Sequence, residues 1–102
     1  MNRILETHRQ EVVAACQRFA VERLEVFGSA MRADFDAEKS DVDLIVRFRA
    51  PDTPGVADRY YDLAETLERI LGRRVDLVTE RSLRSPLFLQ KIAADRVTVY
   101  AA

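Results

Sequence analysis

The sequence has few of the residues that mark specialised sites. Its 102 residues include one cysteine, one histidine and no tryptophan. The single cysteine, Cys16, excludes an internal disulfide and a cysteine-rich metal site, so we expect a reducing, cytoplasmic setting. His8 has no second histidine to join it in a metal site. We interpret His8 as a half-buried helix residue and Cys16 as a small core residue.

The chain also has no excess of one charge and no long hydrophobic run. It carries 16 basic and 17 acidic residues, and this balance argues against a general nucleic-acid-binding protein. The start, MNRILETHRQ, has no apolar core of signal-peptide length, and no later run is long enough to cross a membrane. The chain is the size of one small domain, and 48% of its residues are hydrophobic and 32% are charged. These values predict one soluble domain over residues 1–102.

Hydrophobic spacing predicts alternating helices and strands. We expect helices at residues 2–20, 56–71 and 82–94, the last broken or restarted at Pro86, and a short helix or turn at 29–32. Strands are expected at 24–27, 42–48 and 75–79, with a possible edge strand at 97–100. This order predicts an α/β or α+β fold with helices on one face of a small sheet. The helix at 56–71 is long enough to join parallel strands, so we expect a mixed sheet.

Two aspartates stand at the start of the second expected strand. Side chains alternate across a strand, so Asp41 and Asp43 should share one face while Val42 and Leu44 face the core. Two carboxylates so close repel each other unless a cation lies between them or one binds a proton. Hard divalent cations such as Mg²⁺ suit this arrangement.

Asp76 repeats the pattern on the next strand. Its neighbours Val75 and Leu77 should face the core, which places Asp76 on the same side as Asp41 and Asp43. If the two strands are neighbours, three carboxylates converge. Such a group would suffice for the two Mg²⁺ ions of a phosphoryl- or nucleotidyl-transfer site.

Gly28 and Ser29, which end the first strand, could supply the complementary half of the site. Glycine lets the backbone approach a phosphate, a helix starting at Ser29 would direct N–H groups at the anion, and Arg32 could reach the same phosphates. Each feature alone has an ordinary explanation: Gly-Ser usually marks a turn, and Asp-X-Asp often lies at a strand edge or cap. Their combination with Asp76 favours a site.

The stretch FGSAMRADFDAEKSDVDLIVRF resembles the signature of the DNA polymerase β-like nucleotidyltransferase superfamily, in which Gly-Ser is followed by a spacer and Asp-X-Asp. Over essentially its whole length, the chain is similar to the minimal nucleotidyltransferase (MNT) proteins of that superfamily. The resemblance implies the palm-like fold of these enzymes. It also implies that Gly28 and Ser29, with Arg32, hold the nucleotide triphosphate, that Asp41 and Asp43 bind metal, and that Asp76 is a third ligand that serves or assists the general base.

The same resemblance implies a biological role. MNT proteins commonly pair, as antitoxins, with a HEPN-domain toxin, and are thought to transfer AMP from ATP to a tyrosine of that toxin. A HEPN-domain partner, ATP as substrate and Mg²⁺ are therefore expected here. Two alternatives remain open. One is an antitoxin that neutralises its partner by binding alone, with residues such as Leu87 and Phe88 at the interface; the other is a nucleotidyltransferase that acts on a small molecule or on nucleic acid.

Overall fold

The computed structural model describes residues 3–27, 41–83, 85–93 and 96–102, except for the side chains of Arg3, Phe88 and residues 91–93. Nine elements follow one another in these ranges. They are α1 (Arg3–Thr7), α2 (Arg9–Arg18), β1 (Val21–Phe27), β2 (Val42–Phe48), α3 (Val56–Leu71), β3 (Val75–Thr79), the 3₁₀ helix η2 (Glu80–Ser82), α4 (Pro86–Ala93) and β4 (Val97–Ala101).

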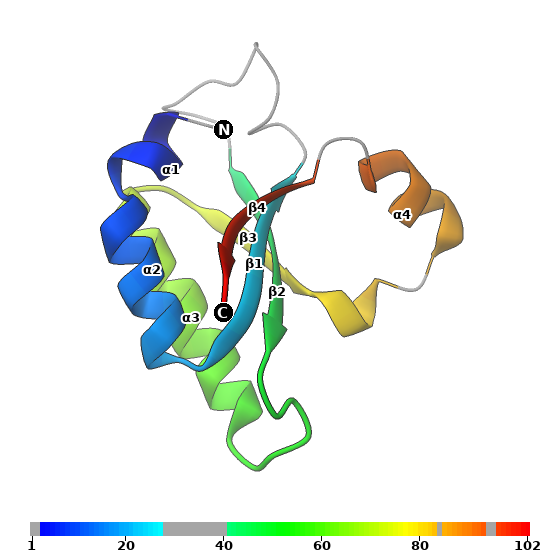
Figure 1. Cartoon of the computed structure of the whole chain (residues 1–102), viewed down its shortest axis with the longest axis horizontal. Helices are drawn as coiled ribbons and strands as arrows, with labels where there is room; N and C mark the ends of the chain where they lie inside the picture. Colours follow the sequence, from blue (N-terminus) through cyan, green and yellow to red (C-terminus); the bar gives the residue numbers. More distant parts are fainter. Residues whose placement is uncertain (1–2, 28–40, 84, 94–95) are drawn as a thin grey trace.

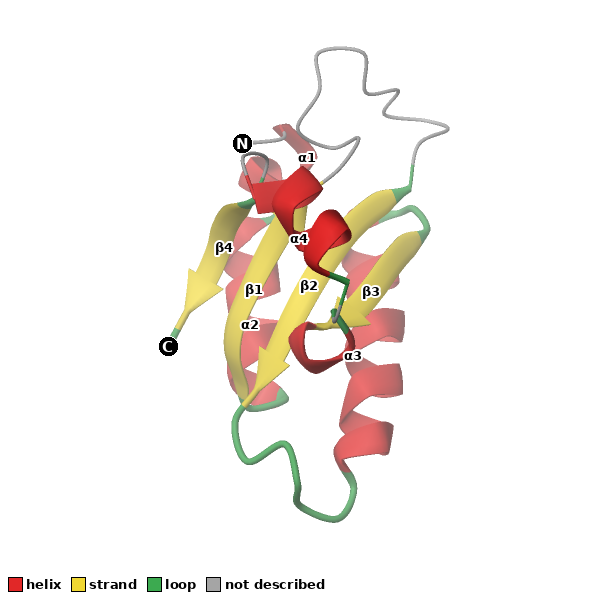
Figure 2. Ribbon diagram, turned by 90° about the vertical axis from the view of Figure 1, so that its right-hand side faces the viewer, coloured by secondary structure: helices red, strands yellow, loops and turns green. Residues whose placement is uncertain are grey.

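The four strands form one mixed sheet in the order β3-β2-β1-β4. β1 is antiparallel to both β2 and β4, whereas β2 and β3 are parallel and are joined by α3. Figure 2 shows this sheet face-on, with α2 and α3 behind it. The expected α+β fold and the parallel pairing of the second and third strands are therefore confirmed.

The hydrophobic core lies between the sheet and the helices α1, α2 and α3. Its fully buried side chains come from alternate positions of β1 and β2 and from one stripe of α3: Leu24, Val26, Val42, Leu44, Val46, Leu63 and Leu67. Cys16 of α2 is also completely buried there, as predicted. In Figure 1, α4 lies on the other side of the sheet, so the expectation of helices on one face holds for α1–α3 but not for α4.

Three of the expected elements have the observed bounds, and the differences in the others are local. β2, α3 and β3 match, and α4 restarts at Pro86, where proline suits the first turn because its missing N–H has no partner to lose. Helix α3 ends at Gly72, whose positive φ of 67° is the left-handed conformation that glycine adopts most easily. The helix expected at 2–20 is divided at His8, and β1 begins at Val21, earlier than predicted. The short helix or turn expected at 29–32 lies outside the described residues.

Arg59 joins α3 to the loops at one end of the sheet. Its guanidinium donates to the carbonyl oxygens of Arg49 and Ala50, both at 3.1 Å, and stacks over the Phe48 ring at 5.0 Å. These contacts satisfy carbonyl groups of the segment that follows β2, which includes Ala50 with a φ of +47°. Among the described residues, no helix is long and apolar enough to cross a membrane.

Candidate active site

Asp43 and Asp76 are direct neighbours in the sheet. The parallel register pairs Val42 with Val75, Asp43 with Asp76 and Leu44 with Leu77. The valines and leucines of these pairs pack into the core, so alternation places both aspartates on the face away from α2 and α3. Asp43 is partly exposed and Asp76 is exposed. Two of the three predicted carboxylates are thus brought side by side on the predicted face.

Asp41 is exposed and immediately precedes β2. Strand alternation does not determine its direction, because the ladder begins at Val42. Among the described residues, no three His, Cys, Asp or Glu side chains are grouped closely enough to hold a metal ion. The convergence of Asp41 on Asp43 and Asp76 therefore stays a prediction.

The predicted phosphate-binding residues Gly28, Ser29 and Arg32 lie outside the described residues. The structure does describe Phe27, the residue immediately before them in the sequence. Phe27 is the last residue of β1 and pairs with Asp43 in the antiparallel ladder. One row across the sheet therefore contains Phe27, Asp43 and Asp76.

Helix α3 holds the backbone of β3 on both sides of Asp76. Because β3 is an edge strand, half of its backbone polar groups point away from β2. The Val75 N–H donates to Glu68 Oε2 at 3.1 Å, and the Tyr60 hydroxyl donates to the Leu77 carbonyl oxygen. Both anchors fix the strand segment that carries Asp76. Tyr60 lies within the helix expected at 56–71, but its anchoring role could not be predicted, since its partner is a backbone group on another element.

The environment of Tyr60 also affects its ionisation. Burial raises the pKa of the Tyr60 hydroxyl, and the negative charge of Asp76 raises this pKa further. The phenol therefore stays protonated and remains a hydrogen-bond donor to Leu77 at neutral pH.

Next to the aspartates lies a small apolar cluster on the same face. Phe27 and Ile45 are buried there, and the partly buried Val78 and Leu83 pack against them. Ile45 and Val78 pair in the register two residues after Asp43 and Asp76, so they form the adjacent row of the sheet. The carboxylates consequently border an apolar patch whose central side chains, Phe27 and Ile45, are buried.

The donor set suits a hard divalent cation. Asp43 and Asp76 offer carboxylate oxygens from adjacent strands, and Mg²⁺ characteristically binds through one or two carboxylates together with substrate phosphates and water. The pair would also relieve its mutual repulsion by sharing a cation. On the chemistry of its donors, the site fits magnesium.

A surface hollow lies at the other end of β2. It is lined by Val46, Arg47, Phe48, Pro51, Asp52, Val56, Thr79, Glu80, Arg81 and Ser82. Two of its arginines are in ion pairs, Arg47 with Glu22 at 3.1 Å and Arg81 with Asp52 at 2.7 Å. The hollow includes none of the predicted site residues, so we do not identify it with the nucleotide site.

The sequence and fold match those of known nucleotidyltransferases. Residues 9–99 match the model of the nucleotidyltransferase domain family. The chain belongs to the nucleotidyltransferase domain family. Protein adenylyltransferase MntA of Thermococcus cleftensis is 42% identical over 82 residues, which cover 80% of this chain and 76% of the relative.

Solved structures of nucleotidyltransferases share the fold. A candidate minimal nucleotidyltransferase matches with a TM-score of 0.74 and 34% identity, over 95% of both chains. A chain from the Shewanella oneidensis complex of a tri-AMPylated HEPN toxin with an MNT antitoxin matches with a TM-score of 0.64 and 19% identity, over 95% of this chain and 72% of the other. The family and enzyme class predicted from the sequence are confirmed.

Proposed function

We propose that this nucleotidyltransferase is an antitoxin with a HEPN-domain partner protein. It transfers AMP from ATP to the hydroxyl group of a tyrosine on that partner. The observation that carries the proposal is the pairing of Asp43 with Asp76 on one sheet face of a nucleotidyltransferase domain. Support for a protein acceptor comes from the relative named protein adenylyltransferase MntA. Support for the partner comes from the structurally similar MNT antitoxin complex.

The proposed reaction is an in-line displacement at the α-phosphorus of ATP. The acceptor oxygen forms a bond to the α-phosphorus. The bond between the α-phosphorus and the oxygen that bridges to the β-phosphorus breaks, and pyrophosphate leaves. The hydroxyl proton passes to a base, and Asp76 is the proposed base or assists it. The chain's other contribution is to hold the two reactants in line and to stabilise the charge that develops.

The remaining residues have proposed roles in binding the nucleotide. Asp41 and Asp43 would hold magnesium, with Asp76 as a third ligand, and Gly28, Ser29 and Arg32 would contact the phosphates. Bound magnesium would supply neutralisation of phosphate charge. Convergence of Asp41 on the other two carboxylates would then accompany the binding of metal and nucleotide, since a cation removes the repulsion between them.

The test is a mass measurement on the partner. The purified chain, the HEPN-domain protein, ATP and Mg²⁺ should give an AMP adduct on the partner, and tandem mass spectrometry should place it on tyrosine. Asp43→Asn and Asp76→Asn should each slow adduct formation by at least about 100-fold. Asp62→Asn is the matched control, because Asp62 is an exposed aspartate of α3. No adduct with the unmodified chain, or equal rates in all variants, contradicts the proposal.

A second candidate function is neutralisation by binding alone. The observation that favours it is Leu87 of α4, whose side chain is 78% exposed. An exposed leucine on a helix outside the main core can contribute to a protein interface. The double variant Asp43→Asn/Asp76→Asn distinguishes the two functions in cells: full protection against the partner would favour binding, and loss of protection would favour catalysis.

A further inference from the structure

Three charged side chains meet on the sheet face that carries the aspartates. Arg96 donates from Nη2 to Glu25 Oε1 at 2.5 Å and from Nε to Glu25 Oε2 at 3.3 Å, and Nη2 also lies 3.3 Å from Glu80 Oε1. The side chains of Glu25 and Arg96 are only 10% and 18% exposed. A carboxylate buried this far is costly unless it is paired and hydrogen-bonded, as it is here.

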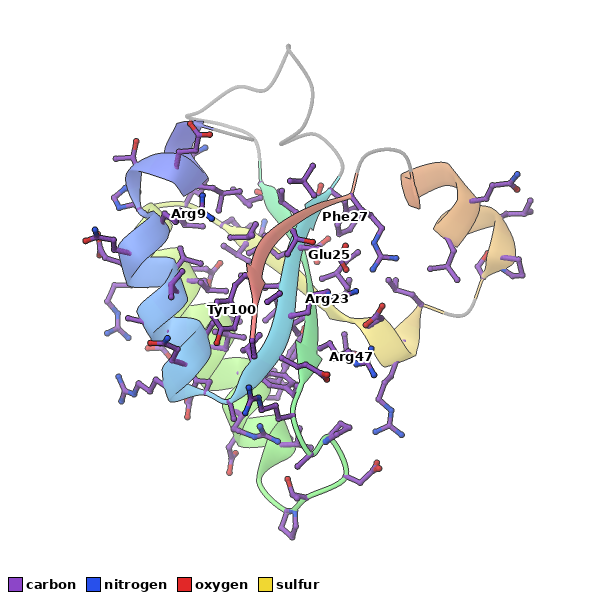
Figure 3. All side chains as sticks on the ribbon, viewed as in Figure 1. Arg9, Arg23, Glu25, Phe27, Arg47 and Tyr100 are labelled. Carbon is purple, nitrogen blue, oxygen red and sulfur yellow. The ribbon has the colours of Figure 1, made fainter. Side chains whose placement is uncertain are left out.

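This cluster joins elements that are distant in the sequence. Glu25 belongs to β1, Glu80 opens η2 directly after β3, and Arg96 immediately precedes β4. Strand alternation places Glu25 on the same face as Phe27, and Figure 3 shows both residues on the α4 side of the sheet. The ion pairs therefore tie the chain that leaves β3 back across this face. We call Arg96, Glu25 and Glu80 the clasp.

The clasp lies beside the apolar cluster that borders the aspartates. Glu25 pairs in the register with Ile45, and Ile45 pairs with Val78. Leu83, three residues after Glu80, packs against this cluster, and its N–H donates to the Glu80 carbonyl oxygen at 3.1 Å. Holding Glu80 thus helps to hold Leu83 against Phe27 and Ile45, beside Asp43 and Asp76. Without the clasp, the segment after β3 would lose the Arg96–Glu80 ion pair that ties it to the sheet face.

We propose that Arg96 is a positioning residue for adenylyl transfer. Through Glu25 and Glu80 it keeps Leu83 against the cluster of Phe27 and Ile45, and so maintains the apolar border beside Asp43 and Asp76. Exclusion of water strengthens electrostatic interactions in the site, and displacement of a reacting group by about 1 Å can cost about 100-fold in rate. The inference rests on the proposed function.

The clasp requires arginine rather than a positive charge alone. The guanidinium fork bonds both carboxylate oxygens of Glu25 and still reaches Glu80. A lysine ammonium keeps the charge but cannot reproduce this planar, bidentate geometry. The hydrogen bonds to Glu25 and Glu80 also raise the pKa of Arg96, which favours its charged form.

The test compares Arg96→Gln with Arg81→Gln. Arg81 is the matched control: it lies in η2 next to Glu80, but its partner is the exposed Asp52. With ATP, Mg²⁺ and the HEPN-domain protein, Arg96→Gln should lower kcat about 10- to 100-fold and change the KM for ATP by less than about threefold. Arg96→Lys should give an intermediate kcat, and Arg81→Gln should match the unmodified chain.

Two further measurements separate the possible failures. Glu80→Gln leaves the Arg96–Glu25 bonds in place, so it tests the clasp if Arg96→Gln does not fold; it should lower kcat in the same direction. Hydrogen exchange of the Ile45 and Val78 amides should accelerate in Arg96→Gln but not in Arg81→Gln. An inactive unmodified chain would refute the proposed function while hydrogen exchange still tests the clasp. An active chain whose Arg96 and Glu80 variants keep kcat, or amides that exchange as before, would overturn the inference.

Discussion

Asp43 of β2 and Asp76 of β3 are register partners in the only parallel pair of strands among the described elements. Helix α3 separates them in the sequence and also anchors the backbone on both sides of Asp76. The same helix thus makes the connection that allows parallel pairing and fixes the strand that brings the second carboxylate to the first.

Magnesium should stabilise the folded chain through this pair. At a free Mg²⁺ concentration ten times the Kd, ligand linkage adds about 1.4 kcal/mol to the free energy of unfolding. The expected rise in Tm should disappear in Asp43→Asn/Asp76→Asn and persist in the Asp62→Asn control. A rise of equal size in the double variant would show that the cation binds elsewhere.

Loss of the Tyr60 hydroxyl should weaken the fold. Tyr60→Phe removes the donor to the buried Leu77 carbonyl group, so the free energy of unfolding should fall by about 1 kcal/mol. Tyr61→Phe is the control, because Tyr61 is 69% exposed and should change stability by less than about 0.5 kcal/mol. Urea unfolding monitored by circular dichroism measures both. Equal decreases in the free energy of unfolding for the two variants would mean that the hydrogen bond from Tyr60 to Leu77 does not stabilise the fold.

Cys16 should make stability depend on alkaline pH. Burial raises its pKa from 9.0 to about 12, so between these values the unfolded thiol loses its proton while the folded thiol keeps it. Stability is therefore lost as the pH rises above 9. Between pH 8 and pH 10 the unmodified chain should lose about 1.4 kcal/mol more than Cys16→Ala. Parallel stability curves for the two proteins would contradict this assignment.

Leu87 offers a test of the partner interface. Leu87→Ser should change Tm little, since the side chain is largely exposed, but should weaken the complex with the HEPN-domain protein by about 1–2 kcal/mol if α4 binds it. Tyr61→Ser, an exposed position on α3 on the opposite side of the sheet, should leave affinity unchanged. Calorimetric titration measures both values. Equal affinity of Leu87→Ser and the unmodified chain would exclude a contribution from this residue.

The sequence predicted the bounds of helices and strands correctly where the hydrophobic periodicity and the residues that end an element agree. The helix at 56–71 has a strong apolar stripe and a terminal glycine, and the strands at 42–48 and 75–79 are dense in β-branched residues, so the bounds of all three are reproduced. Alternation also predicted correctly that Asp43 and Asp76 share a face. These are local properties, and local sequence determines them.

Other parts of the site depend on contacts that no local pattern contains. Arg96 donates hydrogen bonds to Glu25 on β1 and to Glu80 on η2, and Tyr60 donates one to a backbone carbonyl oxygen on β3. The sequence shows an arginine and a tyrosine at ordinary positions in both cases. The direction of Asp41 is also not determined by local pattern, because Asp41 lies one residue before the ladder that enforces alternation.

The α3 crossover has a consequence for folding. The β1–β2 pairing is local, whereas the partnership of Asp43 with Asp76 requires closure of the long segment that contains α3. For non-local contacts of this kind, the entropy of loop closure is lost before the contacts stabilise the chain. Parallel pairing therefore tends to form slowly. During refolding, the helical signal should recover before binding competence does. Nascent chains that stop short of β3 would hold one carboxylate of the pair without the other.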